Sequence, residues 1–302
     1  MRRLFLPGEP FGRYVDPRIV EGLISGPALA TEGQRRVMTV IFCDVKDFVG
    51  VSVEMTPQGL VKVMNGYFST MSAPIHQRGG IIDKYIGDAI MAYWGPPFTA
   101  DVDQARLAGL AALDMLDRVE PFRAELPNLL GLRNIPISFD IRVGIATGEA
   151  LVGSVGSEVM MSYTVMGETV NLASRLEGAN KVYGSRVLAS EATVAASGAA
   201  IETREIDRVV LVGHTHPQPV YEIMGRGGAL TPKQIELRNR YAKGLAAYRD
   251  RRWDDARAAF SAAIAAEPTD GPSAAMLERI DRFVAEPPSK IGMGLGVSSR
   301  NE

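Results

Sequence analysis

The chain of 302 residues has a formal net charge of −2 and a sequence pI near 6.0, which gives no basic footprint for binding nucleic acid. Its single cysteine, Cys43, excludes an internal disulfide framework and fits a reducing cytoplasm. No apolar stretch approaches the roughly 18 residues of a membrane span, and the apolar N-terminal piece is too short for a signal peptide. We therefore expect a cytoplasmic protein with one main domain and a smaller appendage.

The first part of the chain leads into a strand that ends in an acid. Residues 1–35 have a mixed composition, which predicts a linker or signalling segment. A short apolar-periodic piece at 15–23 is followed by a Gly-Pro break at 26–27. The apolar run from Val37 then has strand character and stops abruptly at Asp44. A carboxylate where a hydrophobic strand emerges is costly to desolvate unless it is paired or binds a cation.

A helix and a hairpin follow the first strand. Thr56 is a good N-cap, the proline after it suits the first helical turn, and a Gly-Gly pair at 79–80 ends the helix. Two apolar runs within 81–94 meet at Gly87-Asp88, which predicts a tight hairpin turn with the Asp88 carboxylate at its tip. Two carboxylates at the ends of neighbouring strands predict a divalent-metal site open to a phosphate substrate. The alternative is a pair of solvated acids without a function.

The order of the remaining elements indicates the fold class. We expect a helix over about 101–122, a hairpin over 137–155 that turns near Thr147-Gly148, and a loop that feeds a helix over 168–182. Strand, helix, hairpin, helix, hairpin is not the regular alternation of a doubly wound sheet. The pattern predicts an α+β fold, with a ferredoxin-like-derived antiparallel sheet and helices packed on it.

Four further residues could carry chemistry. Arg142 lies on a predicted strand, where it could clamp phosphate oxygens or be an ordinary exposed arginine. Lys84 points to the same side of the hairpin as Asp88, and a solvated lysine is the alternative. Asn171 and Arg175 are four residues apart on one helix face. They could orient a ribose and neutralise a phosphorane-like transition state, or belong to a solvated face.

The C-terminal part of the chain differs in composition from the rest. Residues 227–231 have the character of a linker, and 232–285 are helical and Ala-rich. The offsets of one tetratricopeptide (TPR) repeat are matched by Gly244, Ala256, Phe260, Ala263 and Pro268. A single repeat is below the number that stabilises itself, so we expect this segment to pack on something else. The Gly/Ser-rich residues 286–302 predict a flexible tail.

Four sequence blocks together resemble the catalytic domain of the class III nucleotide cyclases, over about residues 36–226. In the order of the family they are Phe42-Cys-Asp-Val45, Asp83-Lys-Tyr-Ile-Gly-Asp-Ala-Ile-Met-Ala92, Arg142-Val-Gly-Ile145 and Gly167-Glu-Thr-Val-Asn-Leu-Ala-Ser-Arg175. Four separate blocks in one order argue strongly against a chance match. The resemblance implies an enzyme that makes a 3′,5′-cyclic nucleotide and pyrophosphate by two-metal-ion catalysis.

The resemblance also implies a role for each candidate residue. Two Mg²⁺ or Mn²⁺ ions would be held by Asp44, Val45 and Asp88. Asn171 would orient the ribose, and Arg175 would stabilise the charge at the α-phosphate. The substrate triphosphate would be contacted by Arg142 and by the backbone of Val45, Lys46, Asp47 and Phe48.

Lys84 and Thr164 occupy the positions that select the base in this family. A lysine can donate to adenine N1 and a threonine can accept from the adenine amino group, whereas guanine presents the reverse pattern. The resemblance therefore favours an adenylate cyclase acting on ATP, with a guanylate or mixed-specificity cyclase as the alternative. Threonine at the second position resembles the subgroup that is often stimulated by bicarbonate.

The active site of the family lies at a dimer interface. One protomer would supply the metal half, made of Asp44, Asp88 and Arg142. Its partner would supply the other half, made of Lys84, Thr164, Asn171 and Arg175. Both sets are present in this chain, so we expect a homodimer with two complete sites.

Some positions depart from the family pattern. Asp47 stands where a glycine is usual, Val49 where a threonine is usual, and His214 where a lysine often binds phosphate. A stiffer loop, an added negative charge and a weaker phosphate contact favour a weakly active nucleotide-binding regulatory module as the alternative function. Residues 11–20 resemble linkers that follow sensor or membrane regions, which raises the hypothesis that the chain is the cytoplasmic end of a longer receptor.

Overall fold

The computed structural model describes residues 15–25, 33–48, 55–130, 139–209 and 217–285. Its central feature is an eight-stranded sheet. The helices are α1 (Pro17–Ser25), α4 (Pro57–Gln77), α5 (Gln104–Leu130), α6 (Glu168–Tyr183), α7 (Glu191–Ser197), α8 (Pro232–Arg249), α9 (Trp253–Ala266) and α10 (Gly271–Ala285). The strands are β1 (Gln34–Val45), β2 (Ile81–Ile86), β3 (Ala89–Trp94), β4 (Ile141–Gly156), β5 (Met161–Met166), β6 (Val187–Ser190), β7 (Ile201–Val209) and β8 (Gln218–Arg226). Their order in the sheet is β2-β3-β1-β4-β6-β8-β7, and β5 pairs with β4.

The long strands β1 and β4 form the centre of the sheet. They pair antiparallel along the whole of β1, from Gln34 opposite Val152 to Val45 opposite Ile141. The hairpin of β2 and β3 lies antiparallel on the other side of β1, whereas β6 runs parallel to β4. The predicted α+β fold with a mostly antiparallel sheet and packed helices is therefore confirmed.

The predicted hairpin turn near Thr147-Gly148 is wrong. β4 runs through both residues without a break, because they pair with Thr39 and Met38 of β1. The buried hydroxyl groups of Thr39 and Thr147 lie 2.9 Å apart and join the two strands. The chain turns instead between β4 and β5, where the Ser157 amide donates to the carbonyl of the residue three positions later. Tyr163 to Met166, expected as the start of a loop, are therefore part of strand β5 (Met161–Met166).

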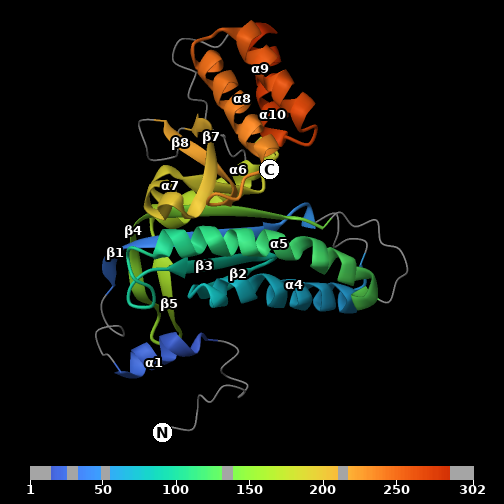
Figure 1. Cartoon of the computed structure of the whole chain (residues 1–302). Coiled ribbons are helices and arrows are strands. Elements are labelled where there is room, and N and C mark those ends of the chain that lie inside the picture. The colour runs from blue at the N-terminus through green and yellow to red at the C-terminus, as the bar shows by residue number, and fades with distance from the viewer. Residues whose placement is uncertain (1–14, 26–32, 49–54, 131–138, 210–216, 286–302) are drawn as a thin grey trace.

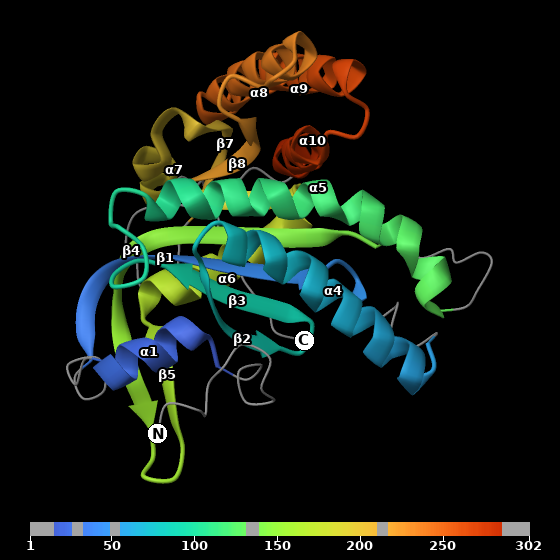
Figure 2. The ribbon, with the colours of Figure 1, turned by 60° about the horizontal axis from the view of Figure 1, so that its bottom comes forward.

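Helices cover both faces of the sheet (Figures 1 and 2). α4 and α5 lie side by side on one face, and α6 lies on the opposite face. The predicted start of α4 is confirmed, because the Thr56 side chain accepts from the amide of Gly59 and Pro57 opens the helix. α5 is longer than expected and continues to Leu130, since Leu126 beyond the predicted end is buried and Phe122, at that end, packs against the ring of Phe139.

The C-terminal helices α8, α9 and α10 form a layer at the end of the sheet that carries β7 and β8 (Figure 1). Tyr241 and Phe260 of these helices belong to the same buried cluster as Tyr183 and Leu188 of the sheet side. The helices and the sheet therefore share one hydrophobic core. Within the described ranges, no helix is both long and apolar enough to cross a membrane.

α6 approaches the sheet closely at Gly144. A Cβ atom at Gly144 would lie 2.2 Å from the carbonyl oxygen of Ala173 and 2.2 Å from the amide nitrogen of Glu177. Since both atoms belong to helix backbone, the clash can be relieved only by moving α6 off β4. This close approach brings the side chains of α6 next to those at the end of β4.

We predict that Gly144→Ala lowers the free energy of unfolding by about 2–4 kcal/mol, because α6 must shift and the core beneath it must repack. Gly178→Ala, on the helix that Gly144 contacts, is the control, since nothing lies within 4 Å of a Cβ at Gly178. The control should gain about 0.5–1 kcal/mol from the better helix propensity of alanine. Urea unfolding measures both values, and equal stability of the two variants would contradict the proposed contact.

Candidate active site

Asp44 and Asp88 lie at adjacent ends of neighbouring strands, as the sequence predicts. Asp44 is the penultimate residue of β1, and Asp88 forms the β2–β3 turn with Gly87. Gly87 has a φ of 63°, which is the left-handed conformation that glycine adopts at little cost. Because Cys43 of β1 pairs with Ile90 of β3, the register brings the turn beside the end of β1.

The electrostatics of Asp44 fit a cation site. Burial, together with the neighbouring Asp88 and the charge of Glu177, raises the pKa of Asp44 to about 8. The Asp44 Oδ1 atom is buried without a hydrogen-bond partner. The ionised form of a buried carboxylate with an unpaired oxygen and acidic neighbours is costly, and a bound divalent cation would stabilise it strongly. The described residues contain no group of three or more His, Cys, Asp or Glu side chains close enough to hold a metal ion. Asp44 and Asp88 therefore form a pair of side-chain donors.

Arg142 lies beside this pair and is held by an acid that the sequence analysis missed. Arg142 of β4 is the cross-strand partner of Asp44 in the β1–β4 register. Its Nε atom lies 3.4 Å from Oε1 of Glu177 on α6, and both atoms are buried without a hydrogen bond. Burial raises the pKa of Glu177, and the charge of Arg142 opposes that shift. The loose pairing leaves the guanidinium able to accept another anionic partner.

Glu177 could have been found from the periodicity of α6. The buried side chains of this helix include Ala173, Leu176 and Asn180. An acid four residues after Ala173 falls on the same face. A carboxylate on the buried face of an amphipathic helix is rare without a partner, and that exception marks a functional position.

Lys84 and Thr164 meet although they are far apart in the sequence. The Lys84 ammonium donates to the Thr164 hydroxyl at 3.3 Å. Asp83 organises the pair, because it accepts from the Thr164 hydroxyl at 2.7 Å and lies 2.9 Å from the Lys84 ammonium. The Asp83 side chain is only 1% exposed, and it sits where the β2–β3 register shifts between Ile82 and Lys84. Asp83 belongs to the second of the four sequence blocks, but its local pattern indicates no role for it.

Asn171 and Arg175 lie on the first half of α6, on the face predicted from their spacing. Asn171 is exposed, and its amide is 3.5 Å from Oε2 of Glu168. Arg175 pairs with the other oxygen of Glu168 at 2.8 Å. The seven candidates thus fall into three places in one protomer: the two acids with Arg142, the Lys84–Thr164 pair, and the N-terminal half of α6.

The loop after Asp44 keeps a conformation that favours glycine. Asp47 has a φ of 55°, in the left-handed region. This conformation costs a non-glycine residue about 1 kcal/mol, although Asp tolerates it better than most residues. The Lys46 amide donates to the Asp140 carbonyl at 2.9 Å, which ties the loop to the start of β4. Phe48 ends the described part of this loop, and Val49 and His214 lie outside the described residues.

Residues 31–225 match the family described as the adenylate and guanylate cyclase catalytic domain. The chain belongs to this family, the class III nucleotide cyclases. It is 36% identical over 216 residues to "Adenylate cyclase 1" of Rhizobium meliloti, covering 71% of this chain and 32% of that protein. It is 32% identical over 222 residues to "Adenylate cyclase" of Anabaena cylindrica, covering 72% of this chain and 42% of that protein. The chain thus spans less than half the length of these two curated relatives.

Solved structures of cyclases resemble the fold over the same part of the chain. The adenylyl cyclase CyaB from P. aeruginosa aligns with a TM-score of 0.59 and 30% identity, covering 66% of this chain and 100% of that one. The guanylyl cyclase Cya2 aligns with a TM-score of 0.57 and 31% identity, covering 66% of this chain and 97% of that one. Adenylate and guanylate cyclases are therefore almost equally similar, and base preference must be argued from the side chains.

We predict a pH-dependent stability for the metal-free protein that originates at Asp44. The pKa rises from the ordinary value of 3.8 to about 8 on folding. Between these values the native state binds more protons than the unfolded state, so this contribution to the free energy of unfolding falls as the pH rises. Allowing for partial solvent exposure, Asp44→Asn should gain about 1–2 kcal/mol over wild type between pH 5 and pH 8.

Urea unfolding in EDTA at the two pH values measures this effect. Asp101→Asn, a change at an exposed acid, is the matched control and should follow wild type. An identical pH dependence of wild type and Asp44→Asn would contradict the assigned protonation.

Proposed function

We propose that the chain is an adenylate cyclase that converts ATP to 3′,5′-cyclic AMP and pyrophosphate. The observation that carries the proposal is the pair Asp44 and Asp88 at adjacent strand ends, with a buried oxygen left without a partner, in a chain of the cyclase family. In this reaction the ribose 3′-oxygen attacks the α-phosphorus, the bond to the pyrophosphate oxygen breaks, and the hydroxyl proton is lost.

The metal half of the site would hold two Mg²⁺ or Mn²⁺ ions through Asp44, Asp88 and the backbone carbonyl of Val45. When bound, such ions lower the pKa of the ribose 3′-hydroxyl and bind the triphosphate. Arg142 binds triphosphate oxygens, and these contacts replace its loose contact with Glu177. The remaining triphosphate contacts come from the backbone amides of Val45, Lys46, Asp47 and Phe48.

The second half of the site orients the nucleoside and stabilises charge. Asn171 orients the ribose, and Arg175 neutralises the negative charge that develops at the α-phosphate. Both residues already interact with Glu168, which holds their side chains near the start of α6. The single departure inside the described loop, Asp47, adds negative charge near the triphosphate and favours a modest turnover.

Base selection follows from the direction of the hydrogen bonds around Asp83. The Thr164 hydroxyl donates its proton to Asp83, so its oxygen faces a ligand as an acceptor. Lys84 is held beside it by the same carboxylate and presents N–H donors. An acceptor next to a donor matches the amino group and N1 of adenine, whereas guanine requires the opposite order. The pair therefore supports ATP over GTP.

A homodimer would complete the site, with the metal half of one protomer facing the second half of its partner. The protruding β4–β5 hairpin supports this assembly (Figure 2), because apolar side chains are exposed along it. They include Val159 at 96%, Met160 at 73% and Met161 at 56% exposure. Such a patch on a soluble domain marks an interaction surface.

Finer proposals rest on the sequence alone. Thr164 at the second base position supports a bicarbonate-responsive subgroup. The residues before the catalytic domain support an upstream sensor or membrane region. We further propose the division into a segment 1–35, a catalytic domain 36–226 and a TPR-like segment 232–285, in which Gly244 lies against the ring of Phe260. The proposed tail 286–302 lies outside the described residues.

We predict that the protein forms cyclic AMP from ATP with Mn²⁺ or Mg²⁺, and that Asp44→Ala and Asn171→Ala each abolish product formation. A one-to-one mixture of the two variants should recover about a quarter of wild-type activity, because half of random dimers are mixed and each has one intact site of two. Liquid chromatography of the product measures both effects. Wild-type protein that binds ATP without turnover would favour a regulatory nucleotide-binding module, and a mixture without activity would contradict the shared site.

We predict that Asp83→Asn lowers the ratio of kcat/KM for ATP over GTP by about tenfold or more, because an asparagine amide can donate to Thr164 and reverse its role. Asp103→Asn is the matched control, since it makes the same chemical change at an exposed ion pair with Arg106. Steady-state kinetics with both nucleotides measure the ratio. An unchanged ratio in a folded Asp83→Asn protein would contradict the role of Asp83.

A further inference from the structure

The end of α6 opposite to Asn171 and Arg175 is held by the C-terminal helices. α6 stops at Gly184, whose φ of 63° places it in the left-handed conformation. The first residue of α10, Gly271, lies against it: a Cβ at Gly271 would come within 2.3 Å of the Gly184 carbonyl oxygen. The two backbones therefore touch, and only glycine at position 271 permits the contact.

A buried ion pair secures this contact. The guanidinium of Arg279 on α10 pairs with Asp207 of β7. The hydroxyl of Tyr183, the last residue of α6, donates to the same carboxylate oxygen at 2.8 Å. Arg279 also lies over the Tyr183 ring at 5.5 Å from its centroid. One arginine thus joins α10, β7 and the end of α6, and removing one member of such a buried group leaves the others unpaired.

A second buried arginine holds the C-terminal helices on the sheet. Arg204 of β7 donates to Glu222 of β8 at 2.5 Å and pairs with Asp270, which precedes α10. Its guanidinium lies 4.8 Å from the ring centroid of Tyr241 on α8. Because Arg204 is only 4% exposed, its charge is stabilised almost entirely by these partners. Buried charge pairs therefore fix the C-terminal helices to β7 and β8.

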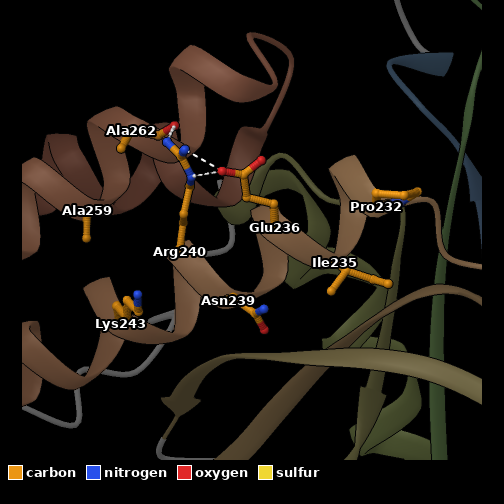
Figure 3. A pocket seen from close by; sticks show the side chains of 8 residues that line it. All are labelled: Pro232, Ile235, Glu236, Asn239, Arg240, Lys243, Ala259 and Ala262. Atoms are coloured by element: carbon orange, nitrogen blue, oxygen red, sulfur yellow. Dashed lines mark hydrogen bonds and ion pairs between the residues drawn. The ribbon is translucent and has the colours of Figure 1, made fainter.

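The contacts with α6 use one side of the C-terminal layer. A different side carries an open groove between α8 and α9 (Figure 3). The groove is lined by residues of both helices, among them Glu236, Arg240 and Ala262. In it, Arg240 is occupied by Glu236 and by the carbonyl of Ala262. The face that contacts α6 is connected, through that helix, to the candidate active site.

We infer that α10 acts as a clamp on α6, with Gly271 and Arg279 as positioning residues for Asn171 and Arg175; the inference rests on the proposed cyclase function. The helix is a stiff connection, and from Tyr183 to Arg175 it spans about 12 Å at 1.5 Å per residue. A shift of its anchored end moves both side chains relative to the α-phosphate and ribose, where a displacement of about 1 Å can cost a large factor in rate. α10 lies beyond the residues that match the family model, so the clamp acts on the catalytic domain from outside it.

The test compares Arg279→Met with Arg257→Met in the full chain. Arg257 pairs with Asp281 at an exposed site in the same helical layer, so the control makes the same chemical change away from α6. Arg279→Met should lower kcat for ATP about tenfold and change KM by less than about twofold, because the misplaced groups act on the transition state. Arg257→Met should stay within about twofold of wild type in both. Arg279→Lys, which retains the charge facing Asp207, should recover part of kcat.

Hydrogen exchange of the α6 amides separates this inference from the proposed function. In Arg279→Met the amides near Tyr183 should exchange about tenfold faster, while those of α4 stay as in wild type. Gly271→Ala keeps every charge but forces α10 away from Gly184, and it should reproduce both effects even if Arg279→Met fails to fold. Values of kcat and exchange equal to those of Arg257→Met would overturn the clamp. If wild type forms no cyclic AMP, the proposed function fails, whereas the exchange comparison still decides whether α10 holds α6.

Discussion

The antiparallel pairing of β1 with β4 is the constraint on which the rest of the structure depends. It sets Asp44 opposite Arg142, and it sets Gly144 opposite Phe42 in the interior of the ladder. Because Gly144 has no side chain, α6 can lie directly on β4 and bring Glu177 to Arg142. A slip of one residue in the β1–β4 register would move one strand's residues to the opposite face. Asp44 would then no longer lie opposite Arg142, and Gly144 would no longer lie opposite Phe42.

The charges in the two halves of the molecule are balanced in opposite ways. Where β7 meets the C-terminal layer, the buried arginines have acidic partners, as Arg204 has Glu222 and Asp270. At the end of β1, Asp44 instead has acids around it and a buried oxygen with no partner. The first arrangement satisfies its charges within the chain and confers rigidity. The second leaves a carboxyl group whose charged form lacks a partner within the chain, and this difference from a structural ion pair supports the proposed cation site.

α6 connects these two parts of the chain. Its first half carries Asn171 and Arg175, its middle carries Glu177 beside Arg142, and its end meets α10. The helix therefore links the proposed substrate-binding groups to the C-terminal layer. Under the proposed function, a single helix that carries site residues at one end and contacts an appended layer at the other would give the appendage a physical route to turnover.

The sequence alone determined the elements whose signals are local: the cap at Thr56, the Gly87-Asp88 turn, and the helix that carries Asn171 and Arg175. It also identified the family, because its motif blocks are contiguous. Only the tertiary structure decided that Thr147 lies inside a strand, since the hydroxyl of Thr39 and the β1 ladder outweigh a local turn signal. It likewise revealed Asp83, Glu177 and the contact of α10 with α6, because each acts through partners distant in sequence. Local propensity depends on neighbouring residues in the sequence, whereas burial and charge pairing arise only when distant segments come together in the fold.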